Sequence, residues 1–145
     1  MTPGTDPGIA FATLQRDTGE RFQTLRRQLG VTGFGINLMV MEPRQRGRVH
    51  AHERQEEVFL VLEGELTVAL ADGTEHVVGP DGLVRIAPQL RRQMINAGPQ
   101  RLVMLALGGS GEHAGRDGRA WERFDDPGPG RPPQEVPAPA DLPAP

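Results

Sequence analysis

A cysteine-free chain of 145 residues can bury a core as a single domain, but it can form neither disulfides nor thiolate metal sites. All 16 basic residues are arginines and the net charge is −3, which excludes a Schiff-base lysine and disfavours nucleic acid or anionic membranes as partners. No apolar run reaches the roughly 18 residues that span a bilayer, and no secretory signal pattern opens the chain. We therefore expect a soluble, cytoplasmic protein.

The first thirty residues give mixed signals. Residues 1–9 are rich in proline and glycine, and we expect them to form a flexible leader. After them, Phe22, Leu25 and Leu29 have helical spacing, and Gly30 is a typical residue for ending a helix. A strand followed by a turn is the competing interpretation of the same segment.

Short apolar runs separated by turn residues indicate antiparallel strands through the middle of the chain. Asp72-Gly73, for example, is a strong signal for a two-residue hairpin. Many short strands at such spacing indicate an all-β sandwich or barrel. The predicted strands cover residues 34–42, 57–63, 65–71, 74–78, 83–86, 92–96 and 101–107.

A histidine pair precedes the second of these strands. His50 and His52 are two residues apart, so on a strand both side chains face one side while Ala51 faces the other. Glu57, at the start of the next run, could add a carboxylate from a neighbouring strand. Two imidazoles and one carboxylate with open positions are the ligand set of a facial-triad site for Fe(II) or a similar divalent ion. A His-x-His pair alone is a weak signal.

The spacing of His50, His52, Glu57 and Gly64 resembles the first motif of the cupin superfamily, in which the two histidines and the glutamate bind metal and the glycine closes the following turn. The resemblance covers residues 34–107. It implies an all-β, cupin-type double-sheet jelly-roll barrel, a small-molecule ligand and a homodimer.

The resemblance and the composition of the flanking segments together suggest how the whole chain is divided. The barrel would extend over residues 10–124, with a strand and a turn rather than a helix before residue 30. Trp121 is expected to pack back on the barrel, and the loop residue His113 is a weak candidate for a replacement ligand. Residues 125–145 are dominated by Pro, Ala, Gly and Asp, and we expect a disordered tail.

The chain departs from the second motif of the family, whose histidine completes the metal site. Aligned without gaps, Arg92 stands in the histidine position and Asn96 matches the motif, whereas a one-residue gap would place Gln93 there. We favour Arg92, because Arg92, Met94 and Asn96 then share the inward strand face. A guanidinium only donates, so it cannot bind a metal. Arg92 could therefore stand beside an intact triad, bind an anionic substrate group, or pair with Glu57 in a metal-free cavity.

Two functions remain open from the sequence. In the first, His50, His52 and Glu57 bind Fe, Mn, Ni, Zn or Cu, and the protein oxidises or isomerises a small anionic or carbonyl-bearing substrate. Arg92 and Gln93 would then contact the substrate. In the second, the barrel is a non-catalytic small-molecule binding or sensing module whose metal site is lost because of Arg92. The sequence does not decide whether the protein is an enzyme.

Overall fold

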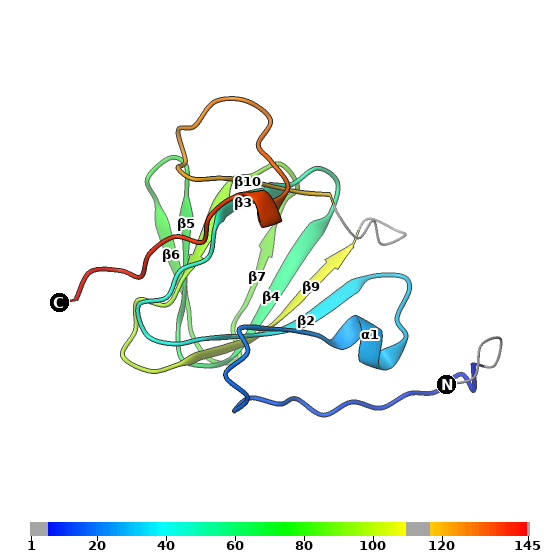
Figure 1. The fold of residues 1–145 in the computed structure, drawn as a ribbon. Coiled ribbons are helices and arrows are strands. Elements are labelled where there is room, and N and C mark those ends of the chain that lie inside the picture. The colour runs from blue at the N-terminus through cyan, green and yellow to red at the C-terminus, as the bar shows by residue number, and fades with distance from the viewer. Residues whose placement is uncertain (1–5, 110–116, 145) are drawn as a thin grey trace.

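The computed structural model describes residues 6–109 and 117–144, and it contains two antiparallel sheets of five strands each (Figure 1). The strand orders are β1-β2-β9-β4-β7 and β10-β3-β8-β5-β6. The prediction of an all-β double-sheet barrel is therefore confirmed. The elements are β1 (Phe22–Thr24), α1 (Leu25–Leu29), β2 (Gly35–Met41), β3 (Val49–His52), β4 (Glu56–Glu63), β5 (Leu66–Leu70), β6 (Glu75–Val78), β7 (Leu83–Ile86), β8 (Arg92–Ile95), β9 (Leu102–Gly109), β10 (Gly118–Trp121) and the 3-10 helix η1 (Pro133–Glu135).

The seven strands predicted between residues 34 and 107 are present, with bounds that differ by at most two residues. Gly64 occupies the turn between β4 and β5 with φ 74°, and a Cβ there would lie 2.3 Å from the carbonyl oxygen of Arg101. Only glycine tolerates both the positive φ and this close backbone approach. The role that the resemblance implied for Gly64 thus has a steric reason.

Inward-facing residues of β2, β9 and β4 line up in rows across the sheet. The first row is apolar and packs into the main core, the second passes from the core residue Phe59 to Asn37 at the cavity, and the third contains two glycines and leaves open space. This difference sets one end of the barrel apart as the end that can contain a cavity. The rows are Met39–Met104–Val61, Asn37–Ala106–Phe59 and Gly35–Gly108–Glu57.

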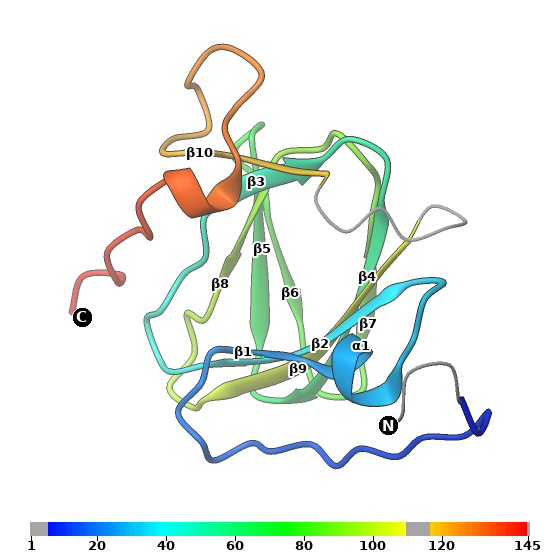
Figure 2. The ribbon, with the colours of Figure 1, turned by 45° about the vertical axis from the view of Figure 1, so that its right-hand side comes forward.

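The outer face of the same sheet is covered by α1 and the N-terminal segment (Figure 2). Leu25 of α1 is 3% exposed and packs in a second apolar cluster with Leu38, Val40 and Val103. The helix ends at Gly30, which has φ 72°. The strand and the helix that competed for this segment are therefore both present. The predicted strand exists as β1, and a one-turn helix follows it instead of a simple turn.

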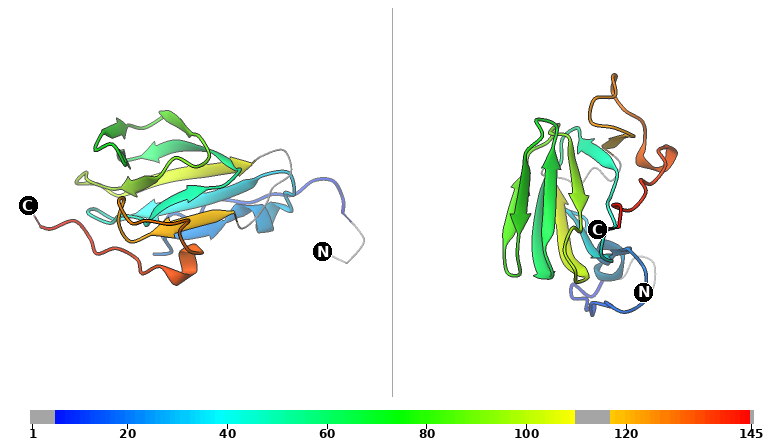
Figure 3. Two further views of the ribbon diagram at one scale, coloured as in Figure 1. Left: turned by 90° about the horizontal axis from the view of Figure 1, so that it is seen from above. Right: turned by 90° about the vertical axis from the view of Figure 1, so that its left-hand side faces the viewer.

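The C-terminal segment confirms the expectation of a disordered tail only in part. Its backbone is irregular apart from η1, yet it runs alongside the barrel (Figure 3) and buries Val136 to 1% exposure. Composition did not reveal these contacts, because arginines far away in the sequence provide them. The hydrogen bonds are Arg48 Nε to the Val136 carbonyl (2.6 Å), Arg46 Nε to the Ala140 carbonyl (2.6 Å) and Leu142 N to the Arg44 carbonyl (2.7 Å).

Two earlier expectations concern residues outside the described ranges: the start of the leader, residues 1–5, and His113. Within the described ranges, no helix is long and apolar enough to cross a membrane. Trp121, on β10, packs against Val49 and Ala51 on the outer face of β3, as expected for a residue that anchors the end of the chain to the barrel.

Candidate metal centre

The histidine pair and Glu57 come together from the two sheets. Val49 and Ala51 on β3 face Trp121, so His50 and His52 project into the barrel from the opposite face. Their rings are 5.4 Å apart and perpendicular. Glu57, on β4 of the other sheet, faces them, and one ligand atom from each of the three residues lies within 4.8 Å of the others. Among the described residues these three form the one group that could hold a metal ion.

Both imidazoles are oriented through Nδ1. His52 Nδ1 lies 2.7 Å from Asp117 Oδ1, and His50 Nδ1 lies 3.1 Å from the carbonyl oxygen of Arg48. An ionised carboxylate and a carbonyl only accept hydrogen bonds, so Nδ1 carries the proton and donates it in each ring. In the neutral ring each Nε2 then keeps its lone pair, which is the arrangement of a metal-binding histidine with an outer partner.

The carboxylate of Glu57 faces both Nε2 atoms, at 3.3 Å from His52 and 3.7 Å from His50. Because a carboxylate oxygen and an unprotonated nitrogen are both acceptors, this approach is favourable only with a positive charge between them. A metal ion satisfies that condition, since bonds of about 2.1 Å at right angles place neighbouring ligands roughly 3 Å apart. The donor set therefore fits a divalent ion.

A proton can supply the same positive charge. Burial lowers the pKa of His52, but the hydrogen bond and the negative charge of Glu57, together with the hydrogen bond to Asp117, raise the pKa above its ordinary value. Burial raises the pKa of Glu57, yet its hydrogen bonds with His50 and His52 hold that pKa well below its usual value. A metal ion and a proton thus compete for the position between Glu57 and the histidine Nε2 atoms, as they do at metal sites in general.

Asp117, just before β10, is a site residue that the sequence reasoning missed. Its Oδ1 accepts the bond from His52, and its Oδ2 accepts the backbone N–H groups of Arg54 and Gln55 at 2.8 Å each. Burial raises the pKa of Asp117, but these three hydrogen bonds together lower it, so the carboxylate is ionised. It is separated from His52 by 65 positions in the chain, so no local spacing could have indicated the contact.

Arg92 lies opposite His50 in the pairing of β3 with β8, and its side chain is fully buried. Its Nη2 donates to Glu57 Oε1 and its Nη1 donates to the Leu90 carbonyl at 2.8 Å, while Nε has no partner in the described part of the chain. Of the three consequences left open by the sequence, pairing with Glu57 is therefore present. It does not occupy Glu57 Oε2 or either Nε2, so a metal position remains.

Gln93 points elsewhere: its side-chain amide donates to the Gly47 carbonyl at 2.9 Å. The alignment without gaps thus places Arg92 beside the triad. Contact of Arg92 and Gln93 with a substrate stays a prediction, since Gln93 Nε2 and both Nη atoms of Arg92 are bonded within the protein.

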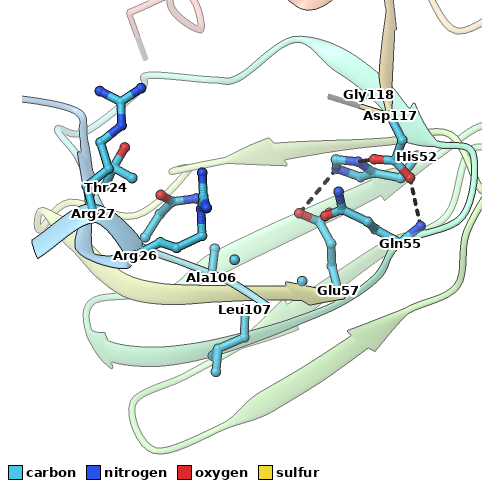
Figure 4. A pocket seen from close by; sticks show the side chains of 13 residues that line it. Thr24, Arg26, Arg27, His52, Gln55, Glu57, Ala106, Leu107, Asp117 and Gly118 are labelled. Carbon is cyan, nitrogen blue, oxygen red and sulfur yellow. Dashed lines mark hydrogen bonds and ion pairs between the residues drawn. The ribbon is translucent and has the colours of Figure 1, made fainter. Parts of the chain in front are cut away.

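A cavity of about 400 Å³ adjoins the triad (Figure 4). Small residues on β2 and β9 keep it open, and a Cβ on Gly108 would lie only 3.0 Å from Gln55 Oε1. This volume suits a small organic molecule. The lining residues are Thr24, Arg26, Arg27, Gly35, Asn37, His52, Gln55, Glu57, Ala106, Leu107, Gly108, Asp117 and Gly118.

The family model of the cupin domain matches residues 37–108, which include the triad, the Gly64 turn and the strand that carries Arg92. The chain belongs to the cupin superfamily. Comparison with curated proteins gives no significant match.

Three solved structures illustrate the cupin likeness. A cupin protein from Bacteroides fragilis is 20% identical with a TM-score of 0.62, and the alignment covers 74% of this chain and 86% of that chain. A sugar phosphate isomerase of the cupin superfamily from Silicibacter pomeroyi is 22% identical with a TM-score of 0.60, covering 79% and 76%. An oxalate oxidase in complex with the substrate analogue glycolate is 19% identical with a TM-score of 0.57, covering 74% and 62%. At these identities the likeness shows the fold alone.

Proposed function

We propose that this cupin binds a divalent metal ion through His50, His52 and Glu57 and acts on a small anionic or carbonyl-bearing organic substrate by oxidation or isomerisation. The observation that carries the proposal is the convergence of the Nε2 atoms of His50 and His52 on the Glu57 carboxylate. A bound divalent ion would act as a Lewis acid on a substrate oxygen. The neighbours named as an oxalate oxidase and a sugar phosphate isomerase support this class of substrate.

The protein's own residues would orient the ligands and set the charge. Asp117 fixes the His52 ring, and Arg92 holds one oxygen of Glu57. With a divalent ion present, the charges of the ion, the Arg92 guanidinium and the carboxylates of Glu57 and Asp117 sum to one net positive charge at this end of the cavity. Such a site disfavours cationic substrates and favours anionic ones, because charges interact strongly in a partly buried cavity.

A metal-free, non-catalytic binding module is the second candidate, and the hydrogen bond from Arg92 to Glu57 favours it. In this form the guanidinium neutralises Glu57, and a proton on His52 satisfies the remaining oxygen. The cavity would persist as a small-molecule site.

Metal analysis separates the two candidates. We expect near-stoichiometric Fe, Mn, Ni, Zn or Cu in the purified protein or after incubation with each ion, and loss of binding in His50→Ala and His52→Ala. His76→Ala is the matched control, because His76 is exposed on β6. A wild-type protein that takes up none of these ions would refute the metal-dependent function and leave the binding module.

We also propose that the protein is a cytoplasmic homodimer. The absence of cysteine supports a cytoplasmic location. The usual assembly of the family supports a homodimer. Light scattering on the purified protein tests the assembly, and a monomeric mass at micromolar concentration would refute the dimer.

A further inference from the structure

We propose that Arg26, with Arg27 beside it, forms an anion-binding subsite at the end of the cavity opposite the triad. Its ligand would be the terminal carboxylate or phosphate of a small molecule. The inference rests on the proposed function only for the other end of that molecule, which would bind at the metal site of His50, His52 and Glu57.

The strand register creates the space between the two ends. Glu57 on β4 is opposite Gly108 on β9, and Gly108 is opposite Gly35 on β2. Neighbouring strands are about 4.8 Å apart, so the backbones of β4 and β2 are separated by roughly 10 Å. Gly108, which lies between the two strands, and Gly35, at the β2 end, carry no side chain. A ligand of a few bonds can therefore extend from Glu57 towards the β2 edge.

Local structure holds Arg26 at that edge. The residue before it, Leu25, is buried in the outer cluster, and the helix ends at Gly30 in the left-handed conformation. Thr24, just before the helix, pairs with Asn37 of β2. Figure 4 shows the Arg26 side chain extending over the sheet at the end of the cavity away from Glu57, whereas Arg27 points away from the sheet. Arg26 is therefore the main candidate contact.

Neither guanidinium group has a counterion among the residues that the structure describes. Within the described ranges, no hydrogen bond or ion pair involves the side chain of Arg26 or Arg27, nor that of Asn37 or Thr24. In contrast, many other arginines are paired with carboxylates: Arg16, Arg85, Arg92, Arg101, Arg119 and Arg131.

The carboxylates that do line the cavity are already engaged. Glu57 is bound to Arg92 and faces both histidines, and Asp117 is bound to His52 and two backbone N–H groups. Two adjacent cations without an acidic partner in ranges 6–109 and 117–144 create a positive potential at the rim of the cavity. A guanidinium binds carboxylate and phosphate in a bidentate manner, and the amide of Asn37 and the hydroxyl of Thr24 add neutral donors. These features together specify an oxyanion.

Calorimetry with inorganic phosphate and with malonate, a short dicarboxylate, tests the subsite on the full-length protein. Each probe is titrated into metal-free and metal-supplemented protein, and the tighter one identifies the preferred anion. We expect Arg26→Gln to weaken anion binding about tenfold or more, because a charge-assisted hydrogen bond is lost. Arg27→Gln should weaken anion binding less, because the Arg27 side chain points away from the sheet. Arg123→Gln is the matched control, because Arg123 is an exposed arginine that does not line this cavity.

Two results would overturn the subsite: no binding of either probe to the wild type, or equal binding in the wild type, Arg26→Gln and Arg27→Gln. Metal affinity, measured in the same variants, should stay the same or rise. Because phosphate is also titrated without metal, a protein that takes up no metal but binds phosphate through Arg26 would refute only the proposed function. A protein that binds metal but no anion would refute only the subsite.

Discussion

Arg92 on β8 donates a hydrogen bond from Nη2 to Oε1 of Glu57 on β4, so a buried ion pair joins the two sheets. The side chain of Arg92 is 0% exposed and that of Glu57 is 13% exposed. The guanidinium stands where the family's second motif would place a histidine. This single contact therefore affects both the stability of the barrel and the affinity of the triad for a metal.

Removing the guanidinium should destabilise the protein. Arg92→Ala leaves Glu57 without its cationic partner, and the usual loss for one partner of a buried pair is about 3 to 5 kcal/mol in the free energy of unfolding. A denaturant melt measures this loss. Gln93→Ala is the control, with an expected loss of about 1 kcal/mol for one hydrogen bond to Gly47. Equal losses in the two variants would contradict the importance of the pair.

Arg92→His should have the opposite effect on metal binding. The change removes a cation beside the triad and adds an imidazole opposite His50, so a fourth ligand becomes available. We expect divalent-metal affinity to increase at least about tenfold, as measured by competition calorimetry. Unchanged or weaker metal affinity would show that position 92 lies too far from the metal to contribute.

Asp117→Asn tests the outer partner of His52. An amide can accept the Nδ1 proton only weakly and carries no charge, so the histidine loses basicity and orientation. We expect metal affinity to fall 10- to 100-fold, the usual range for such a partner. The control is Asp141→Asn in the tail, where the aspartate is exposed. Equal metal affinity in both variants would rule out the role of Asp117.

Local periodicity explains why the sequence predicted so much of this site. Alternation on β3 places His50 and His52 on one face, and the same alternation from Glu57 places Phe59 and Val61 inward, where both are buried. These relationships span a few residues and follow from strand geometry alone. The position of Arg92 is a different case, because it was predicted from the alignment with the family's second motif, which left pairing with Glu57 as one of three alternatives.

Contacts between distant segments were not predictable in this way. The bond of Asp117 to His52 and the approach of Arg26 to the cavity depend on which strands become neighbours and on where a one-turn helix begins. The tail is a similar case, because its proline-rich composition indicates disorder while its partners, Arg46 and Arg48, precede it by about 90 residues. The composition of a segment therefore does not identify the distant residues that the segment packs against.

The tail should contribute to stability. Val136 is 1% exposed, so Val136→Ala is expected to lower the free energy of unfolding by about 1 to 3 kcal/mol, the range for a buried valine. Deleting residues 132–145 should cost more, because the hydrogen bonds from Arg46 and Arg48 are lost as well. Thermal or denaturant melts measure both changes.

The control for the tail is Val77→Ala, at a position that is 63% exposed, which should shift stability by less than about 0.5 kcal/mol. An unchanged melt after the deletion would mean that the tail does not pack in solution.

The N-terminal segment should be attached more weakly at acid pH. Glu63 Oε2 accepts hydrogen bonds from Arg16 Nη1 at 2.6 Å and from Arg101 Nη2 at 3.4 Å, which ties this segment to the end of β4. The bond from Arg16 and the charge of Arg101 lower the pKa of Glu63 from its ordinary value of 4.5. Because the pKa is lower in the folded protein, the stabilisation is complete above pH 4.5 and is lost as the pH falls through the lowered value.

Glu63→Gln measures this contribution directly. At pH 7 and low salt, the variant should be less stable than the wild type by a few tenths of a kcal/mol, the scale of a solvent-screened ion pair. At pH 3, below the ordinary value of 4.5, the difference in the free energy of unfolding should shrink, since Glu63 is then mostly protonated in the unfolded chain and the ion pair must form against that protonation. Glu65→Gln, at an exposed position next to the turn, is the control for a general change in net charge. A Glu63→Gln effect of the same size at both pH values would mean that the ion pair does not stabilise the fold, because only an ionised Glu63 can attract Arg16 and Arg101.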